Sequence, residues 1–271
     1  MKNRIHFISG LPRSGSTLLG AILRQNPACH AGMTSPVGSL VTALLRQMSQ
    51  DNETAVFIDD TQRHAVLDAV FDAYYRQVPA STVVFDTNRL WCSKLPLLST
   101  LFPRARVIAC VRHVPWILDS IERLVRRNRF EPSKIFNFEP GGTVYSRIEG
   151  LGSGTGMVGF AWNALREAFY GEEADRMMLL TYETLTSDPQ RAMNAVYEFL
   201  SEPRFGHDFE DLQYDAREFD ARLGTPGLHD VGRTVRAMPR ETVLPPDLFR
   251  RVEGDSFWQD PALNTRGVRV V

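Results

Sequence analysis

The chain has little cysteine and no long hydrophobic run. Its 271 residues include only three cysteines, Cys29, Cys92 and Cys110, an odd number without the spacing of a metal site. We interpret them as free thiols in a reducing compartment. No apolar run approaches the roughly 18 residues that a membrane span requires, and the N-terminus enters an apolar run too soon for a signal peptide. These absences predict a cytoplasmic protein.

The chain also lacks an excess of charge of either sign. Its 31 Lys and Arg residues face 32 Asp and Glu residues, for a formal net charge of −1. This balance gives no support to nucleic acid or a membrane surface as a partner. With 43% hydrophobic residues the composition is that of an ordinary globular protein, long enough for a full core. We expect a single domain over residues 1–271.

The first apolar run ends in a glycine-containing loop, GLPRSGST, from Gly10 to Thr17. Gly10, Gly15 and Thr17 match the spacing of the nucleoside-triphosphate loop, but Ser16 replaces its lysine and the nearest cation is Arg13. An amphipathic stretch follows, so backbone N–H groups and a helix dipole would converge on one anion. Because the missing lysine normally bridges the terminal phosphates of a triphosphate, we expect a different anion here.

Short apolar runs alternate with amphipathic stretches along the rest of the chain. The runs predict strands at residues 4–9, 82–86, 106–111 and 177–181, with helices between them. This alternation is typical of a buried parallel sheet. The prediction is an α/β fold: a three-layer P-loop-type domain with a central parallel sheet flanked by helices.

Two segments depart from this pattern. Residues 139–159 carry seven glycines and little apolar periodicity, and we interpret them as a mobile lid loop. Residues 202–247 are polar and rich in Asp, Arg and Pro. We expect them to form an extended arm that wraps the domain.

A second anion site is indicated by the run that ends in Arg112. Ser120 follows after seven residues, about two turns into the next expected helix. In an open α/β sheet, ligands bind beyond the carboxyl ends of the strands. Arg112 and Ser120 could also be ordinary structural residues. Two candidate anion sites at neighbouring strand ends, however, favour a ligand with two separate anionic groups.

The sequences GLPRSGSTLL and LFPRARVIACVR, with Ser120 following the second, resemble the sulfotransferase superfamily. Its members use 3′-phosphoadenosine-5′-phosphosulfate (PAPS). The resemblance covers residues 4–200 and is greatest to the tyrosylprotein sulfotransferases and their bacterial relatives. It implies an enzyme that moves a sulfuryl group to an acceptor hydroxyl by in-line displacement, releases 3′-phosphoadenosine-5′-phosphate (PAP) and needs no metal.

The resemblance also implies roles for individual residues. Arg112 and Ser120 would hold the 3′-phosphate, and Arg233 in a late basic segment would close over it. Tyr182, in the sequence Thr-Tyr-Glu, would contact the nucleotide, although it could instead cover the sheet edge. The residues implied to hold the 5′-phosphosulfate are Arg13, Ser14, Gly15, Ser16 and Thr17. Arg13 would also stabilise charge on the leaving phosphate.

The general base is where this sequence departs from the family. The tyrosylprotein branch has a glutamate shortly after the first helix, but this chain has no carboxylate between residues 28 and 45. Asp86 is the best candidate for the base, with Arg89 as its nearby catalytic cation. Asp86 could also be a cap or an ion-pair partner. His30 and His229 are weaker candidates, and each could instead be a surface histidine.

Two other functions stay open. A P-loop nucleotide kinase would share the first loop, although the missing lysine and the lack of an obvious acidic strand end for magnesium oppose it. A catalytically inactive protein that binds PAPS or PAP would explain the missing glutamate. The sequence leaves the acceptor open between a small molecule, a sugar and a peptide tyrosine, and it leaves the oligomeric state open.

Overall fold

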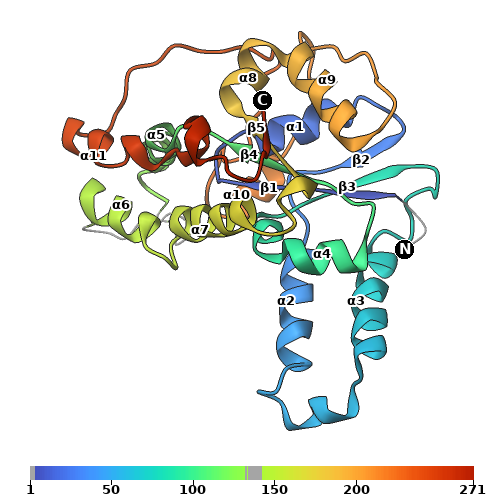
Figure 1. Ribbon diagram of the computed structural model, residues 1–271. Helices are drawn as coiled ribbons and strands as arrows, with labels where there is room; N and C mark the ends of the chain where they lie inside the picture. Colours follow the sequence, from blue (N-terminus) through green and yellow to red (C-terminus); the bar gives the residue numbers. More distant parts are fainter. Residues whose placement is uncertain (1–3, 132, 134–141) are drawn as a thin grey trace.

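A parallel six-stranded sheet forms the centre of the protein (Figure 1). The computed structural model describes residues 4–131, 133 and 142–271. In the order β2-β3-β1-β4-β5-β6, every neighbouring pair is parallel. The strands are β1 (Ile5–Gly10), β2 (Cys29–Ala31), β3 (Val83–Thr87), β4 (Val107–Val111), β5 (Met177–Thr181) and β6 (Arg269–Val270). The four inner strands were predicted. The edge strands β2 and β6 are too short to show periodicity.

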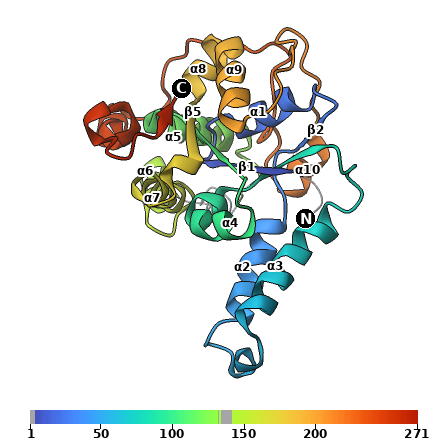
Figure 2. The same ribbon diagram turned by 45° about the vertical axis from the view of Figure 1, so that its right-hand side comes forward.

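Helices cover both faces of the sheet, which confirms the three-layer prediction (Figures 1 and 2). On one face lie α1 (Ser16–Leu23), α8 (Tyr182–Ser187) and α9 (Pro189–Leu200). On the other lie α2 (Val37–Gln47), α3 (Asp60–Tyr74), α4 (Leu95–Leu101), α5 (Val114–Arg127), α6 (Val144–Gly152), α7 (Met157–Tyr170) and α11 (Pro246–Arg251). None of the helices in the described residues is long and apolar enough to cross a membrane.

Successive residues of the inner strands belong to opposite core layers. In β4, Ile108 packs with α1 and α9, and Ala109 packs in the other layer; both are fully buried. Side chains alternate across a strand, so a strand covered on both faces must be apolar at every position. This explains why the inner strands appear in the sequence as uninterrupted apolar runs.

The prediction of a lid loop at 139–159 is wrong over most of its length. Helix α6 occupies residues 144–152, and α7 begins at Met157. A Cβ on Gly156 would lie 2.1 Å from the backbone oxygen of residue 150, and one on Gly159 2.0 Å from that of residue 153. The glycines therefore permit close packing where α6 meets α7 rather than mobility. Residues 139–141 lie outside the described residues.

Residues 202–245, which we call the arm, cross the surface with α10 (Arg217–Arg222) as their helix. The last part of the arm is held on α5 by Asp119, whose side chain is fully buried. Its carboxylate accepts hydrogen bonds from Thr242 Oγ1 (3.0 Å) and from the backbone N–H of Val243 (2.7 Å). The arm is thereby fixed beside Ser120, the next residue of α5.

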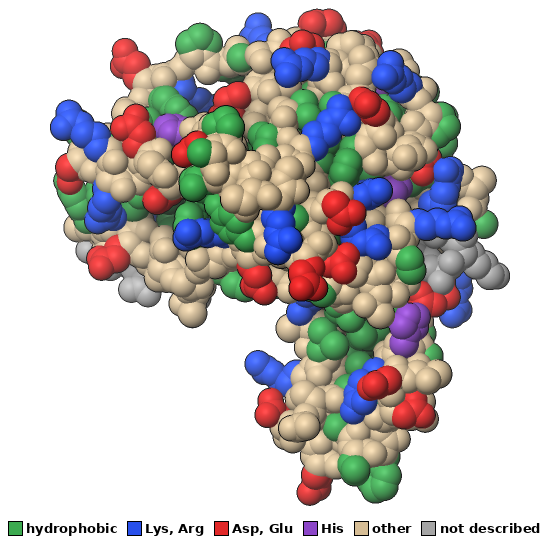
Figure 3. Space-filling model, in the orientation of Figure 1, with side chains coloured by type: hydrophobic (Ala, Val, Ile, Leu, Met, Phe, Trp, Pro, Cys, Tyr) green, Lys and Arg blue, Asp and Glu red, His purple; other side chains and the backbone are tan. Residues whose placement is uncertain are grey.

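Helices α2 and α3 project from the body as a hairpin, visible in both ribbon views (Figures 1 and 2). A short helix, η1 (Glu53–Phe57), forms its tip. Hydrophobic side chains lie at this tip (Figure 3), where Val56 and Phe57 are 80% and 81% exposed. The hairpin places the segment before α2 at one wall of the cavity described below.

We predict that Gly10→Ala lowers the free energy of unfolding by about 2–4 kcal/mol. Gly10 has a φ of 103°, and a Cβ there would lie 2.2 Å from the Cys110 backbone oxygen. The alanine must therefore push β1 away from β4. Gly224→Ala is the matched control, because φ is 64° there with nothing within 4 Å of a Cβ; it should cost about 1 kcal/mol. Urea unfolding measures both, and equal losses would contradict the close-contact argument.

Candidate functional site

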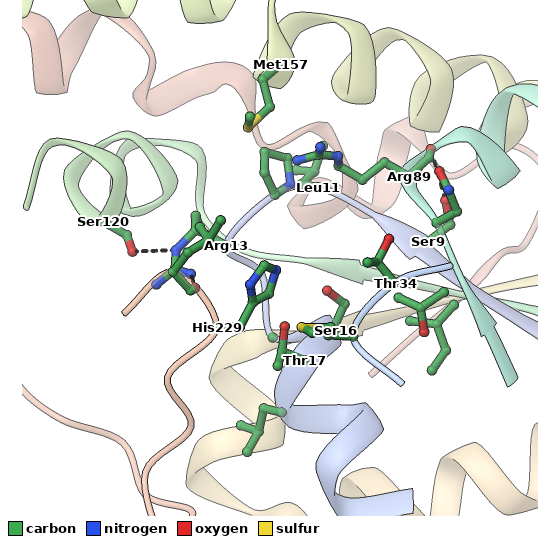
Figure 4. Close-up of a pocket in the computed structure, with 18 of the residues that line it drawn as sticks. Ser9, Leu11, Arg13, Ser16, Thr17, Thr34, Arg89, Ser120, Met157 and His229 are labelled. Atoms are coloured by element: carbon green, nitrogen blue, oxygen red, sulfur yellow. Dashed lines mark hydrogen bonds between the residues drawn. The ribbon is translucent and has the colours of Figure 1, made fainter. Parts of the chain in front are cut away.

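A cavity of about 930 Å³ lies at the carboxyl ends of the inner strands (Figure 4). Residues at the ends of four strands line it: the loop after β1, Thr87–Leu90 from the last residue of β3 onward, Arg112 after β4 and Tyr182 after β5. The start of α7 and the arm complete the wall. This is the edge at which parallel α/β sheets bind their ligands, as the sequence predicted.

The loop after β1 has the geometry of an anion site. Gly10, Arg13 and Gly15 have positive φ angles of 103°, 59° and 93°, a backbone conformation that occurs in anion-binding loops. The backbone hydrogen bonds of α1 begin where Leu19 N–H donates to Gly15 O (2.8 Å). The N–H groups of the first turn therefore have no intrahelical acceptor, and Ser16 of that turn lines the cavity, as does Thr17.

Ser14 is the exception within this loop. Its side chain is 1% exposed, and its Oγ donates to the Pro12 backbone oxygen (3.3 Å). Ser14 is also not among the residues that line the cavity. Its hydroxyl therefore shapes the loop, and only its backbone N–H is left for a ligand.

Residues that the sequence assigned to separate anion sites meet in the cavity. Arg13 Nε donates to Ser120 Oγ (3.1 Å), a contact drawn in Figure 4, and the Arg13 guanidinium also donates to the Leu228 backbone oxygen of the arm. The Arg112 guanidinium lies over the ring of Tyr182, 4.2 Å from its centroid. Arg112 Nε is buried and has no hydrogen-bond partner among the described residues.

The arginines around the loop repel one another. Burial and the charges of Arg112 and Arg240 lower the pKa of Arg13 to about 10. Burial and Arg240 likewise lower the pKa of Arg112. Of the described residues lining the cavity, Asp230 is the one carboxylate, and it lies 3.5 Å from Arg127. An anionic ligand would supply the missing negative charge.

Arg233 does not reach this cluster, contrary to the prediction. Its Nε pairs with Asp211 (2.6 Å), its side chain is 74% exposed, and it does not line the cavity. Arg240, seven residues further along the arm, lines the cavity instead. The arm has no periodicity from which the direction of a side chain could be inferred, so the sequence could not distinguish the two.

Asp86 is also not where a general base must be. It lies within β3, is fully buried and does not line the cavity. Its carboxylate accepts hydrogen bonds from Ser35 Oγ (2.8 Å), Tyr75 Oη (2.6 Å) and Trp91 Nε1 (2.8 Å). Burial raises the pKa of Asp86 although these three donors lower it. The carboxylate connects β3 to the segments before α2 and after α3, and an acceptor has no access to it.

Arg89, the predicted companion of Asp86, does line the cavity. It begins the short helix η2 (Arg89–Lys94). Burial lowers the pKa of Arg89. Among the described residues its guanidinium has no ion-pair or hydrogen-bond partner.

His229, which the sequence analysis ranked below Asp86, lines the cavity. The sequence also allowed a surface position, but its side chain is 17% exposed and stands in the cavity near Arg13 (Figure 4). Its Nδ1 lies 2.6 Å from Asp220 Oδ1, and its backbone N–H donates to Asp220 Oδ2 (2.8 Å). The buried carboxylate is an acceptor for Nδ1–H, and in the neutral ring of that tautomer Nε2 is the proton-accepting atom.

Fold and site together define a P-loop-type α/β domain with several arginines around a cavity at its strand ends. The family model described as "Sulfotransferase family" matches residues 6–207, and the chain belongs to this family. The resemblance stated from the two motifs is thereby confirmed.

Two curated proteins are similar to the chain at low sequence identity. The chain is 25% identical over 239 residues to protein-tyrosine sulfotransferase 1 of Danio rerio, covering 84% of this chain and 60% of that protein. It is also 25% identical over 240 residues to protein-tyrosine sulfotransferase 2 of Gallus gallus, covering 84% and 58%. The chain therefore spans about three fifths of the length of these relatives.

Two solved structures share the fold. The sulfotransferase domain from the curacin biosynthetic pathway has a TM-score of 0.58 at 18% identity, covering 93% of this chain and 96% of that one. The sulfotransferase from Alicyclobacillus acidocaldarius has a TM-score of 0.51 at 14% identity, covering 82% and 89%. These likenesses confirm the predicted P-loop-type α/β architecture.

We predict that Asp86→Asn retains kcat to within about threefold, because the carboxylate is structural. Asp86→Ala leaves Tyr75 Oη and Trp91 Nε1 without their acceptor, and it should lower the free energy of unfolding by about 2–5 kcal/mol. Sulfuryl-transfer rates and urea unfolding measure the two effects. If kcat falls by a factor of about 10²–10⁴ in a stably folded Asp86→Asn protein, Asp86 is the general base after all.

Proposed function

We propose that this chain transfers a sulfuryl group from PAPS to an acceptor hydroxyl and releases PAP. The observation that carries the proposal is the cluster of Arg13, Arg112 and Arg240 around one cavity. Asp230, the one carboxylate in the described lining, cannot balance three positive charges. The buried Nε of Arg112 still lacks an acceptor among the described residues. A nucleotide with anionic groups on both its 5′ and 3′ sides would satisfy both features.

The loop and the strand ends divide the donor between them. The N–H groups at the start of α1 and the Arg13 guanidinium would hold the 5′-phosphosulfate. Arg112 and Ser120 would hold the 3′-phosphate, and Tyr182, under the Arg112 guanidinium, would contact the nucleotide. PAPS supplies the sulfuryl group when bound. Arg13 stabilises the charge that develops on the leaving phosphate, while the loop holds the reacting atoms in line.

His229 takes the proton of the acceptor hydroxyl. It lines the cavity, and Asp220 fixes its ring with Nε2 as the proton acceptor. The other ionisable candidate in the described lining, Asp230, is half-exposed and lies near Arg127. The acceptor is a hydroxyl of a small molecule, a sugar or a peptide. The likeness to tyrosine sulfotransferases supports a phenol as the first acceptor to test.

The donor site predicts tight binding of PAP without magnesium, measured by calorimetric titration. Arg112→Ala should weaken the affinity about 100-fold, because it removes charge-assisted hydrogen bonds to the 3′-phosphate. Arg233→Ala is the matched control and should leave the affinity unaltered, since Arg233 pairs with Asp211 outside the cavity. ATP should bind far more weakly. A preference for ATP with magnesium would instead identify a nucleotide kinase.

The assignment of His229 predicts a specific loss in His229→Gln. The rate constant kcat should fall about 10²–10⁴-fold, while PAP binds with nearly unchanged affinity. His30→Gln is the matched control, because His30 is exposed and does not line the cavity. Loss of PAP affinity in His229→Gln would make His229 a donor ligand instead of the base. If the wild type binds PAP but sulfates no hydroxyl, the chain is a catalytically inactive protein that binds PAPS or PAP.

A further inference from the structure

Helix α5 carries a fully buried carboxylate, that of Asp119, directly beside the donor site. Asp119 precedes Ser120 in the chain, but it does not line the cavity. Its oxygens accept hydrogen bonds from three donors: Thr242 Oγ1 (3.0 Å), the backbone N–H of Val243 (2.7 Å) and Arg123 Nε (2.8 Å). A carboxylate away from water needs such partners, because an unpaired buried charge is strongly unfavourable. The proposed mechanism uses Ser120 and gives Asp119 no part.

The next two turns of α5 hold the same stretch of the arm. The Arg123 guanidinium donates to the Glu241 backbone oxygen, and Arg126 Nη2 donates to that of Val243 (2.9 Å). Asp119, Arg123 and Arg126 follow one another at spacings of four and three residues, so they share one face of the helix. The two arginines are partly exposed, so water competes for their bonds, whereas Asp119 is fully buried. Asp119 is therefore the main anchor of this stretch.

The anchored stretch fixes the backbone next to Arg240, which lines the cavity. Arg240 lies two residues before Thr242, a span of at most about 7 Å even in extended chain. On the other side of Arg240, residues 236–239 are exposed. The next backbone hydrogen bond of the described arm in that direction joins Val235 N–H to Phe209 O (2.8 Å). The contacts with α5 are thus the nearest fixed point from which the Arg240 side chain reaches the cavity.

We propose that Asp119 is a positioning residue for donor binding: by holding the end of the arm on α5, it keeps the Arg240 guanidinium turned into the cavity. The inference rests on the proposed function, because it concerns the donor site of the same reaction. Asp119 acts through Arg240 and touches neither PAPS nor the reacting atoms. A guanidinium on a fixed backbone loses less freedom when it binds an anion, so the anchor raises the affinity for the donor.

The charge of Asp119 alone predicts the opposite effect. Burial lowers the pKa of Arg112, and the Asp119 carboxylate acts on that pKa in the other direction, so its charge reaches the donor site. Removing a carboxylate makes the cavity more positive, and an anion would then bind more tightly. Removing the anchor makes an anion bind more weakly. The direction in which the affinity changes therefore separates the two effects.

The test measures PAP affinity by calorimetric titration in Asp119→Ala, which removes the acceptor of all three bonds. The affinity should fall about 10-fold, the loss expected for one charge-assisted contact. In an Arg240→Ala background the same change should alter the affinity by less than about twofold, because the arginine that Asp119 positions is absent. The KM for PAPS should rise in parallel with the Kd for PAP, while kcat stays within about threefold.

Asp86→Ala is the matched control for lost stability. Asp86 is also a fully buried carboxylate with three donors, but none of them lies on the arm, so PAP affinity should stay within about twofold. Thr242→Val is the milder variant if Asp119→Ala does not fold. It removes one of the anchoring bonds and should weaken PAP binding about threefold, again only when Arg240 is present.

Three results would overturn the inference: tighter binding of PAP in Asp119→Ala, an unchanged affinity, or an equal loss with and without Arg240. The first would show that the charge of Asp119, and not the anchor, acts on the donor site. Each of them leaves PAP binding by the wild type intact, so only the role of Asp119 fails. If the wild type does not bind PAP at all, the proposed function fails as well.

Discussion

The close approach of β1 to β4 at Gly10 sets the position of the loop after β1 relative to Arg112 and Ser120. Gly10 is paired with Cys110, and Leu11 N–H donates to the Cys110 backbone oxygen (2.9 Å). The loop therefore leaves the sheet level with the end of β4, two residues before Arg112. Because of this register, the Arg13 side chain reaches Ser120 on the helix that follows β4. One backbone contact thus joins two sequence motifs about a hundred residues apart into one site.

Charge then determines what the cavity can hold. Three arginines converge on the donor side, and the arm that brings Arg240 is anchored on α5 by the buried Asp119. A site that places like charges together at a helix N-terminus is unfavourable without a ligand and favourable with a polyanion.

Much of this arrangement follows from the sequence, and the exceptions have physical reasons. Apolar runs predicted the inner strands because both faces of the sheet are covered. Motif spacing placed Arg13, Arg112 and Tyr182 at strand ends and Ser120 in the helix that follows Arg112. Asp86 was misjudged because a strand-end carboxylate looks the same in a sequence whether it points to the cavity or to three buried donors. The glycines at the start of α7, Gly156 and Gly159, were taken for flexibility, although they permit close helix packing. Arg233, Arg240 and His229 lie on a segment without periodicity, so only the fold shows which of them face the cavity.

The backbone of Arg13 has a consequence for how such a protein responds to selection. With a φ of 59°, Arg13 occupies the left-handed region that glycine adopts freely and other residues adopt at a cost of about 1 kcal/mol. A glycine at this position would relieve that strain and remove one of the mutually repelling charges. Laboratory evolution for heat resistance alone would therefore favour loss of this arginine. Selection for the proposed anion binding would act in the opposite direction and retain the arginine.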